Sequence, residues 1–222
     1  MGGPSIFKVW QQYYPLFLSG LWSTLKLAFV AVLFGSLLGA FISMLTLSKN
    51  KIINSIGVVY VTIFRGTPIL VQLYIFYYFL PMAFPIMNSL SKTTVVLLAL
   101  IMNSSSYVSE IVRGGILAVD KGQTEAARSL GMSSKNCMRK IVLPQAIKSI
   151  VPSLGNEYIM MVKETSLAST LALNELMFVK TILANKFLIW QPLFIIAAIY
   201  LIVTLVLTYM VNLVEKRLSV SD

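Results

Sequence analysis

Long apolar runs separated by short polar stretches make up most of this chain. Each run reaches or exceeds the ~20 residues that a helix needs to cross a bilayer, and a membrane favours helices because their backbone groups bond within the segment. The runs span residues 16–47, 52–80, 93–115, 147–173 and 190–214, the first of them opening at Pro15. We therefore predict an all-α membrane protein with five transmembrane helices in one domain covering residues 1–222.

The composition agrees with this pattern and excludes several kinds of chemistry. The 222 residues are 57% hydrophobic and 12% charged, and a soluble domain of that length could not bury so much apolar surface. There is no histidine, which excludes histidine metal sites and histidine bases, and the single Cys137 excludes an internal disulfide.

The positive charges predict how the helices are oriented. The net charge is +10, and because the basic residues lie in short loops beside apolar runs, they indicate membrane orientation rather than nucleic-acid binding. If residues 116–144 are cytoplasmic, most basic residues share that side. Only Lys8, Lys92, Lys180 and Lys186 then lie outside. We expect the N-terminus outside and the C-terminus in the cytoplasm.

The longest polar interruption, from Asp120 to Pro144, predicts a short helix. Asp120 and Gln123 suit the N-cap and third positions, and Gly131 suits a left-handed helix end. The apolar side chains of this helix are those of Ala126, Ala127 and Leu130. Since a two-turn helix buries little area against its own chain, we expect them to dock onto something else.

The residues of this loop also resemble a known motif. Glu125-Ala126-Ala127, followed by Gly131 and then by Ile141, Leu143 and Pro144, is similar to the EAA loop of permease subunits of bacterial ATP-binding-cassette (ABC) importers. The resemblance implies the type I ABC importer permease fold, with residues 116–144 as the coupling loop. By this resemblance, the residues that couple the chain to an ATPase are Asp120, Glu125, Ala126, Ala127, Arg128 and Gly131. The alternative is a solvated loop whose alanines reflect helix propensity.

The same resemblance implies the partners of the chain. They are a cytoplasmic ABC ATPase dimer, a second permease (identical or different), an extracytoplasmic amino-acid-binding protein and the amino-acid substrate. ATP and Mg would be bound by the ATPase, with no cofactor in this chain, which has no P-loop motif of its own. We do not expect this chain to be an enzyme, and we expect it in the bacterial cell membrane.

Two glycine-containing motifs concern the shape of the helices. Phe64-Arg65-Gly66-Thr67-Pro68 lies inside the second run, where Gly66 and Pro68 predict a kink or hinge, as does Pro144 after the loop. The F-R-G-T-P string resembles the polar-amino-acid branch of the permease family, the histidine, arginine and glutamine type. Gly35 and Gly39 form a G-x-x-x-G motif that can permit close packing, but as a lone motif we interpret it as tolerance of small residues.

Polar residues inside the third and fourth runs are candidates for a substrate path. Asn103, Ser106, Tyr107 and Glu110 share one helical face, and such a stripe usually faces a bundle interior. The predicted path consists of Asn103, Ser104, Tyr107, Glu110 and Glu157. A buried carboxylate favours a cationic ligand group. The alternatives are that Glu110 pairs with Arg113, and that Glu157 makes a structural hydrogen bond.

These observations predict a permease subunit of an ATP-driven importer of polar amino acids, basic ones included. The alternative is an ion-coupled secondary transporter or channel subunit, which also requires charges within the membrane. The spaced EAA motif and the lack of an internal repeat count against that alternative. Dependence of uptake on an ATPase rather than on an ion gradient separates the two.

Overall fold

The computed structural model describes residues 5–184 and 190–219, and within these ranges all regular structure is helical. The elements are α1 (Ile6–Thr46), α2 (Lys51–Gly66), α3 (Ile69–Tyr74), η1 (Ile75–Phe79), α4 (Leu80–Ala83), η2 (Pro85–Ser89), α5 (Lys92–Ala118), α6 (Lys121–Ser129), α7 (Ser134–Cys137), η3 (Met138–Val142), α8 (Leu143–Glu164), η4 (Thr165–Leu171), α9 (Val179–Leu183) and α10 (Trp190–Ser219). The predicted all-α class is confirmed.

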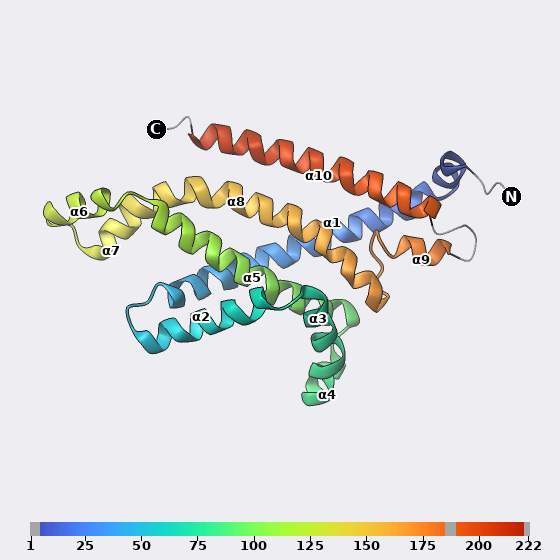
Figure 1. Ribbon diagram of the computed structural model, residues 1–222, viewed down its shortest axis with the longest axis horizontal. Coiled ribbons are helices and arrows are strands. Elements are labelled where there is room, and N and C mark those ends of the chain that lie inside the picture. The colour runs from blue at the N-terminus through green and yellow to red at the C-terminus, as the bar shows by residue number, and fades with distance from the viewer. Residues whose placement is uncertain (1–4, 185–189, 220–222) are drawn as a thin grey trace.

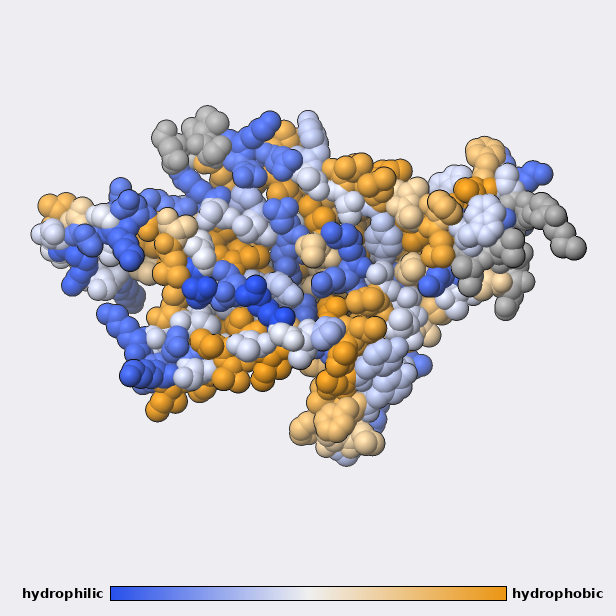
Figure 2. Space-filling model, in the orientation of Figure 1, coloured by the Kyte–Doolittle hydropathy of each residue, from blue (hydrophilic) through white to orange (hydrophobic). Residues whose placement is uncertain are grey.

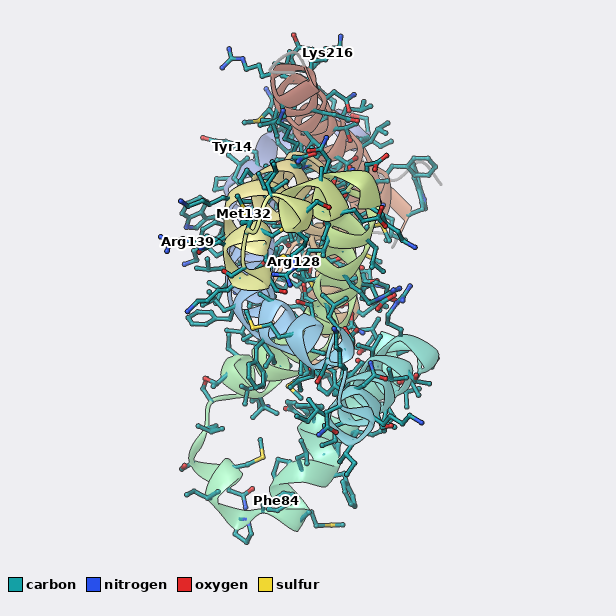
Figure 3. All side chains as sticks on the ribbon, turned by 90° about the vertical axis from the view of Figure 1, so that its left-hand side faces the viewer. Tyr14, Phe84, Arg128, Met132, Arg139 and Lys216 are labelled. Atoms are coloured by element: carbon teal, nitrogen blue, oxygen red, sulfur yellow. The ribbon has the colours of Figure 1, made fainter. Side chains whose placement is uncertain are left out.

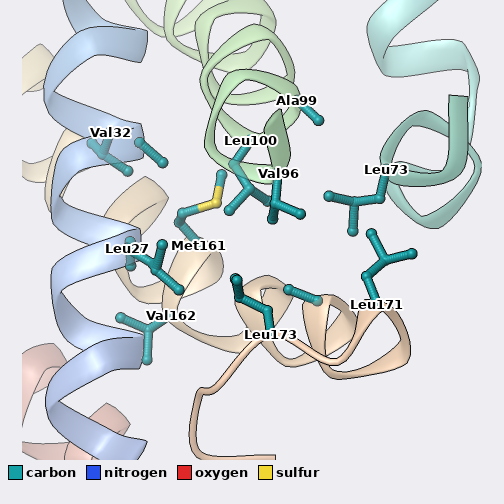
Figure 4. Close-up of a cluster of buried hydrophobic side chains, with 13 residues drawn as sticks. Leu27, Val32, Leu73, Val96, Ala99, Leu100, Met161, Val162, Leu171 and Leu173 are labelled. Atoms are coloured by element: carbon teal, nitrogen blue, oxygen red, sulfur yellow. The ribbon is translucent and has the colours of Figure 1, made fainter. Parts of the chain in front are cut away.

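Four long helices, α1, α5, α8 and α10, run along the length of the molecule, while α3 and α4 project to one side (Figure 1). The main core lies where α1, α5 and α8 meet the broken second segment and the turn after α8. It includes Leu27, Leu73, Leu100, Met161 and Leu171, which point toward one another in Figure 4. Much of the remaining apolar surface is exposed, as expected of a chain that lies in a membrane.

Helices α1 and α5 approach each other through the two glycines of the G-x-x-x-G motif. A Cβ atom at Gly35 would lie 2.9 Å from the side chain of Ser104, and one at Gly39 would lie 2.7 Å from the carbonyl oxygen of Ser105. No side chain fits at such distances without moving the backbone. Our interpretation of the motif as mere tolerance of small residues is therefore wrong, because the glycines are required by close packing.

The first helix begins earlier than the apolar pattern predicts. We expected Pro15 to open it, but α1 begins at Ile6, with Ser5 as its N-cap, and Pro15 lies inside. At 41 residues the helix is about 60 Å long, roughly twice the thickness of a bilayer core. It therefore extends beyond the hydrocarbon on at least one side.

The second run is broken at the predicted place. Helix α2 ends at Gly66, Pro68 is the N-cap of α3, and the chain bends by 102° between α2 and the segment Ile69–Ala83. Pro68 has no backbone N–H, and its preceding residue Thr67 has the extended conformation that a following proline imposes. The predicted kink is confirmed as a sharp corner.

The fourth run behaves as a helix with prolines inside it. Pro144 lies in the first turn of α8, directly after the π-helical turn η3, and Pro152 lies within the helix. A π turn shifts the hydrogen-bond register, and Pro144 follows it without ending the helix. The predicted hinge at Pro144 is therefore a change of helix type rather than a corner.

Length and apolar composition identify three helices in the described residues that can cross a membrane, or four if the bent pair of α2 with α3 and α4 is one span. Helix α8 is not among them, since polar and charged residues including Lys148, Asn156 and Glu157 lower its mean hydropathy. The five-span count and the orientation of the termini remain predictions. The start of α1 and the end of α10 lie at opposite ends of the molecule, with α6 and α7 at the same end as the last turns of α10 (Figure 1).

Candidate functional site

The corner between α2 and α3 is held by the side chain of one residue, Gln72. Helix ends leave backbone carbonyls without partners, and the Gln72 amide nitrogen donates to the carbonyls of Phe64 (2.7 Å) and Thr67 (3.1 Å). It also lies 2.9 Å from the Thr67 hydroxyl. The Gln72 carbonyl accepts a 2.9 Å bond from the amide nitrogen of Asn103. One buried side chain thus joins the corner to α5.

Replacing Gln72 by alanine is expected to destabilise the folded protein by about 1–3 kcal/mol, because the carbonyls of Phe64 and Thr67 and the buried Asn103 amide lose their partner. Thermal unfolding of the detergent-purified protein measures the change. Gln12→Ala, at an exposed position of α1, is the matched control and should leave the unfolding midpoint nearly unchanged. Equal midpoints for the two variants would contradict the role of Gln72 at the corner.

The interior between α5 and α8 contains a buried carboxylate. Glu157 is 8% exposed, and its Oε1 accepts a 2.8 Å hydrogen bond from the Ser104 hydroxyl, which is fully buried. This is the one hydrogen bond that the Glu157 carboxylate makes among the described residues. Since a carboxylate has about four acceptor positions, most of its capacity remains available to another donor.

A second polar cluster lies between α2 and α5. Glu110 accepts two short bonds from Arg113, at 2.9 and 2.8 Å, and also lies 3.5 Å from Arg65. The Arg65 guanidinium stands over the ring of Tyr107, 5.3 Å from its centroid. These charged groups line a cleft of ≈ 380 Å³ together with Thr46, Val58, Val61 and Thr62.

The structure thus divides the predicted substrate path into three places. Ser104 and Glu157 meet in the interior between α5 and α8, whereas Tyr107 and Glu110 contact Arg65 of α2, and Asn103 bonds to Gln72 at the corner. The pairing of Glu110 with Arg113, which the sequence offered as an alternative, is observed. The Asn103 side-chain oxygen is buried without a hydrogen-bond partner among the described residues.

Sequence reasoning missed Glu175, the most heavily bonded carboxylate of the described chain. It accepts bonds of 2.8 Å from the backbone N–H groups of Met177 and Phe178, and longer ones from the hydroxyls of Thr24 and Tyr200. These partners come from α1, α10 and the turn before α9, so Glu175 fastens the turn between two long helices. The one sequence signal for the role of Glu175 is that an acidic residue lies within an otherwise apolar stretch.

The predicted loop helix is present as α6 with both predicted ends. The Asp120 carboxylate accepts from the N–H of Gly122 at the start of the helix. At its end, Gly131 has φ +84°, and the N–H groups of Gly131 and Met132 donate to the carbonyls of Arg128 and Ala127. This pair of bonds is a Schellman motif, which requires a left-handed residue at the glycine position.

The apolar residues of α6 do not all face the same way. Leu130 is 89% exposed and Ala126 is exposed as well, whereas Ala127 is 7% exposed and packs with Cys137 and Val142. The expectation that all three dock onto a partner is wrong for Ala127, because the η3 segment folds back against it. Ala126 and Leu130, four residues apart, form an outward face.

The end of the molecule that carries α6 and α7 is rich in hydrophilic residues (Figure 2). Arg128, Met132 and Arg139 lie at this end, which faces the viewer in Figure 3. Arg128 donates a 2.7 Å bond to the carbonyl of Met132 and thereby supports the turn after α6. Glu125 is exposed on the same helix.

Comparison with known proteins gives matches that extend over most of the chain. Residues 31–220 match the model of a family described as the binding-protein-dependent transport system inner membrane component. The nopaline transport system permease protein NocM of Agrobacterium fabrum is 37% identical, over 93% of this chain and 89% of that protein. The arginine transport system permease protein ArtQ of Bacillus subtilis is 36% identical, over 94% of each chain.

Solved structures show the same likeness in three dimensions. A chain from a crystal structure of an amino acid ABC transporter with histidines has a TM-score of 0.89 and 43% sequence identity, over 98% of this chain and all of that one. A chain of the methionine ABC transporter MetNI in an inward-facing conformation has a TM-score of 0.78 at 18% identity, which shows a shared fold.

Proposed function

The chain belongs to the family of binding-protein-dependent transport system inner membrane components and is a permease subunit of an ABC importer for polar amino acids, and we propose that its substrate passes beside the buried Glu157 while α6 transmits motion from an ATPase. It is an inner membrane protein and not itself an ATPase. Membership of the family implies an ATPase, a substrate-binding protein and a second permease as partners.

The finer features of this assembly are part of the proposal. Two ATPase subunits bind ATP and Mg, this chain binds neither, and an extracytoplasmic protein delivers the amino acid. A second permease, identical or different, completes the path, because a single chain with so few long helices encloses little space. The exposed face formed by Ala126 and Leu130 is the part of α6 that contacts the ATPase.

The observation that carries the substrate proposal is the hydrogen bond between Ser104 and the buried Glu157. A carboxylate removed from water and given one hydroxyl partner attracts a cationic group more strongly than it would in solution. Every amino acid carries an ammonium group, and basic ones carry a second cation. Glu157 therefore suits an amino acid in general and a basic amino acid in particular.

Glu157→Gln tests this assignment through charge selection. The variant keeps the shape and the capacity to bond Ser104 but loses the charge, so arginine uptake should fall by about tenfold or more relative to glutamine uptake, a difference of ~1.4 kcal/mol. Uptake is measured in proteoliposomes that contain the whole importer. Glu215→Gln, at an exposed position near the end of α10, is the matched control. Equal loss for both amino acids would remove Glu157 from charge selection.

The same proteoliposomes distinguish the importer from the ion-coupled alternative. We expect uptake that requires enclosed ATP and the binding protein, and that persists when ionophores collapse the proton and sodium gradients. Uptake by the chain without the ATPase, driven by an ion gradient, would contradict the proposed function.

A further inference from the structure

The cleft between α2 and α5 holds a guanidinium whose donors are largely unused. Arg65 lies near the end of α2, and its one ion pair among the described residues is a 3.5 Å contact with Glu110. Nearly half of its side chain is exposed, and the residue lines the cleft. A guanidinium has five N–H donors in a planar fork that matches a carboxylate, so this one can still accept a ligand.

Glu110 does not fully neutralise the Arg65 guanidinium, because the Glu110 carboxylate is already bonded to Arg113. Two short bonds from Arg113 engage both oxygens of Glu110, which leaves Arg65 with the longer, secondary contact. With two guanidinium groups and one carboxylate, the cleft carries one excess positive charge. Such a site attracts a small anion and holds it best at the group that is less neutralised, which is Arg65.

The position of Arg65 is fixed before any ligand arrives. Its guanidinium stands over the Tyr107 ring, and the α2 end that carries it is fastened to α5 through Gln72 and Asn103. A pre-positioned donor loses less entropy on binding than a mobile one. The cleft volume of ≈ 380 Å³ lies within the ~300–1,000 Å³ that is common for small-molecule sites, and Thr46 and Thr62 also line it.

We propose that this cleft binds the α-carboxylate of the transported amino acid through Arg65, as a site separate from the Ser104–Glu157 pair. The proposal rests on the proposed function, because it takes the ligand to be an amino acid. Glu110 has a defined part in it: its negative charge competes for Arg65 and keeps the carboxylate from binding so tightly that it could not leave.

The test measures equilibrium binding to the purified permease–ATPase complex, without the binding protein and without ATP. The probes are L-arginine and L-glutamine and their α-amides, which lack the carboxylate. Arg65→Gln should weaken the binding of both free amino acids by about 10- to 100-fold, the range expected for a lost hydrogen bond to a charged group. It should leave the weak binding of the amides unchanged. Arg65→Lys should fall between wild type and Arg65→Gln.

Glu110→Gln separates a ligand site from a merely structural contact. Both Arg65→Gln and Glu110→Gln break the Arg65–Glu110 contact, and Glu110→Gln also disturbs the bonds from Arg113, so a structural role predicts weaker binding in each variant. Our proposal predicts opposite effects, with Glu110→Gln tightening amino-acid binding roughly fivefold or more, because ~1 kcal/mol of repulsion is removed. Lys8→Gln removes an exposed cation from the far end of the chain and should change nothing.

Several results would overturn the proposal. They are absence of amino-acid binding to the wild-type complex, equal weakening of acids and amides by Arg65→Gln, and weaker binding in both charge variants. Binding of phosphatidylglycerol to the cleft in place of amino acids, lost in Arg65→Gln, would assign Arg65 to a lipid phosphate instead. Failure of the proposed function would be seen separately, as absence of ATP-driven uptake.

Discussion

Leu130→Asp is expected to abolish most transport while leaving the permease folded and in the membrane. Leu130 is 89% exposed at the end of α6, so a charge there disturbs nothing within the chain. If this leucine fills an apolar pocket of the ATPase, the change removes ~2 kcal/mol or more of contact and adds an unpaired charge to an interface. Transport should then fall by about tenfold or more. Uptake and ATP hydrolysis, measured on the same proteoliposomes, give the degree of coupling.

Ala127→Asp is the informative comparison for that variant, because it should fail in a different way. Ala127 packs with Cys137 and Val142, so a buried charge there disrupts the loop itself and lowers the unfolding temperature. Leu130→Asp should not lower it. Normal, ATP-dependent uptake by Leu130→Asp would show that the outward face of α6 has no part in coupling.

The features of this loop that could be predicted from sequence are those set by neighbouring residues. Asp120 accepts the first free N–H, and Gly131 takes a left-handed conformation that other residues adopt only with strain. The corner at Pro68 has the same local origin, since proline lacks the donor that a continuous helix requires. Which side of α6 is buried depends on the later segment that packs against it, so the sequence could not show that Ala127 faces inward.

The candidate sites depend on contacts between residues that are distant along the chain. Periodicity placed Asn103, Tyr107 and Glu110 on one face of α5, but two partners divide that face, since one bonds to Asn103 and the other contacts both Tyr107 and Glu110. Gln72 joins the corner to α5, while Arg65 reaches Glu110 from α2, and both partnerships are decided by how the helices pack. Glu175 was missed for the same reason, because its partners come from opposite ends of the sequence.

Because α1 and α5 pack closely at Gly39, a large side chain at this position is expected to have the largest effect on the stability of the fold. Gly39→Leu should prevent the two helices from packing, because its Cβ alone would lie 2.7 Å from both the Ser105 carbonyl oxygen and the Val108 Cβ. Overpacking commonly costs about 1–3 kcal/mol when side chains can move. Here the obstacle includes backbone, so we expect little or no folded protein on size-exclusion chromatography.

Two further substitutions distinguish the effect of close packing at Gly39 from the effect of replacing a glycine in a helix. Gly39→Ala meets the same atoms with one methyl group, so it should fold but with an unfolding midpoint clearly below that of wild type. Gly114 lies in α5 with no atom within 4 Å of an added Cβ, and Gly114→Leu should fold at least as well as wild type, since glycine weakens a helix by roughly 0.5–1 kcal/mol relative to alanine. A Gly39→Leu protein as stable as Gly114→Leu would mean that α1 and α5 do not meet through this glycine, and the packing of the main core around them would have to be reconsidered.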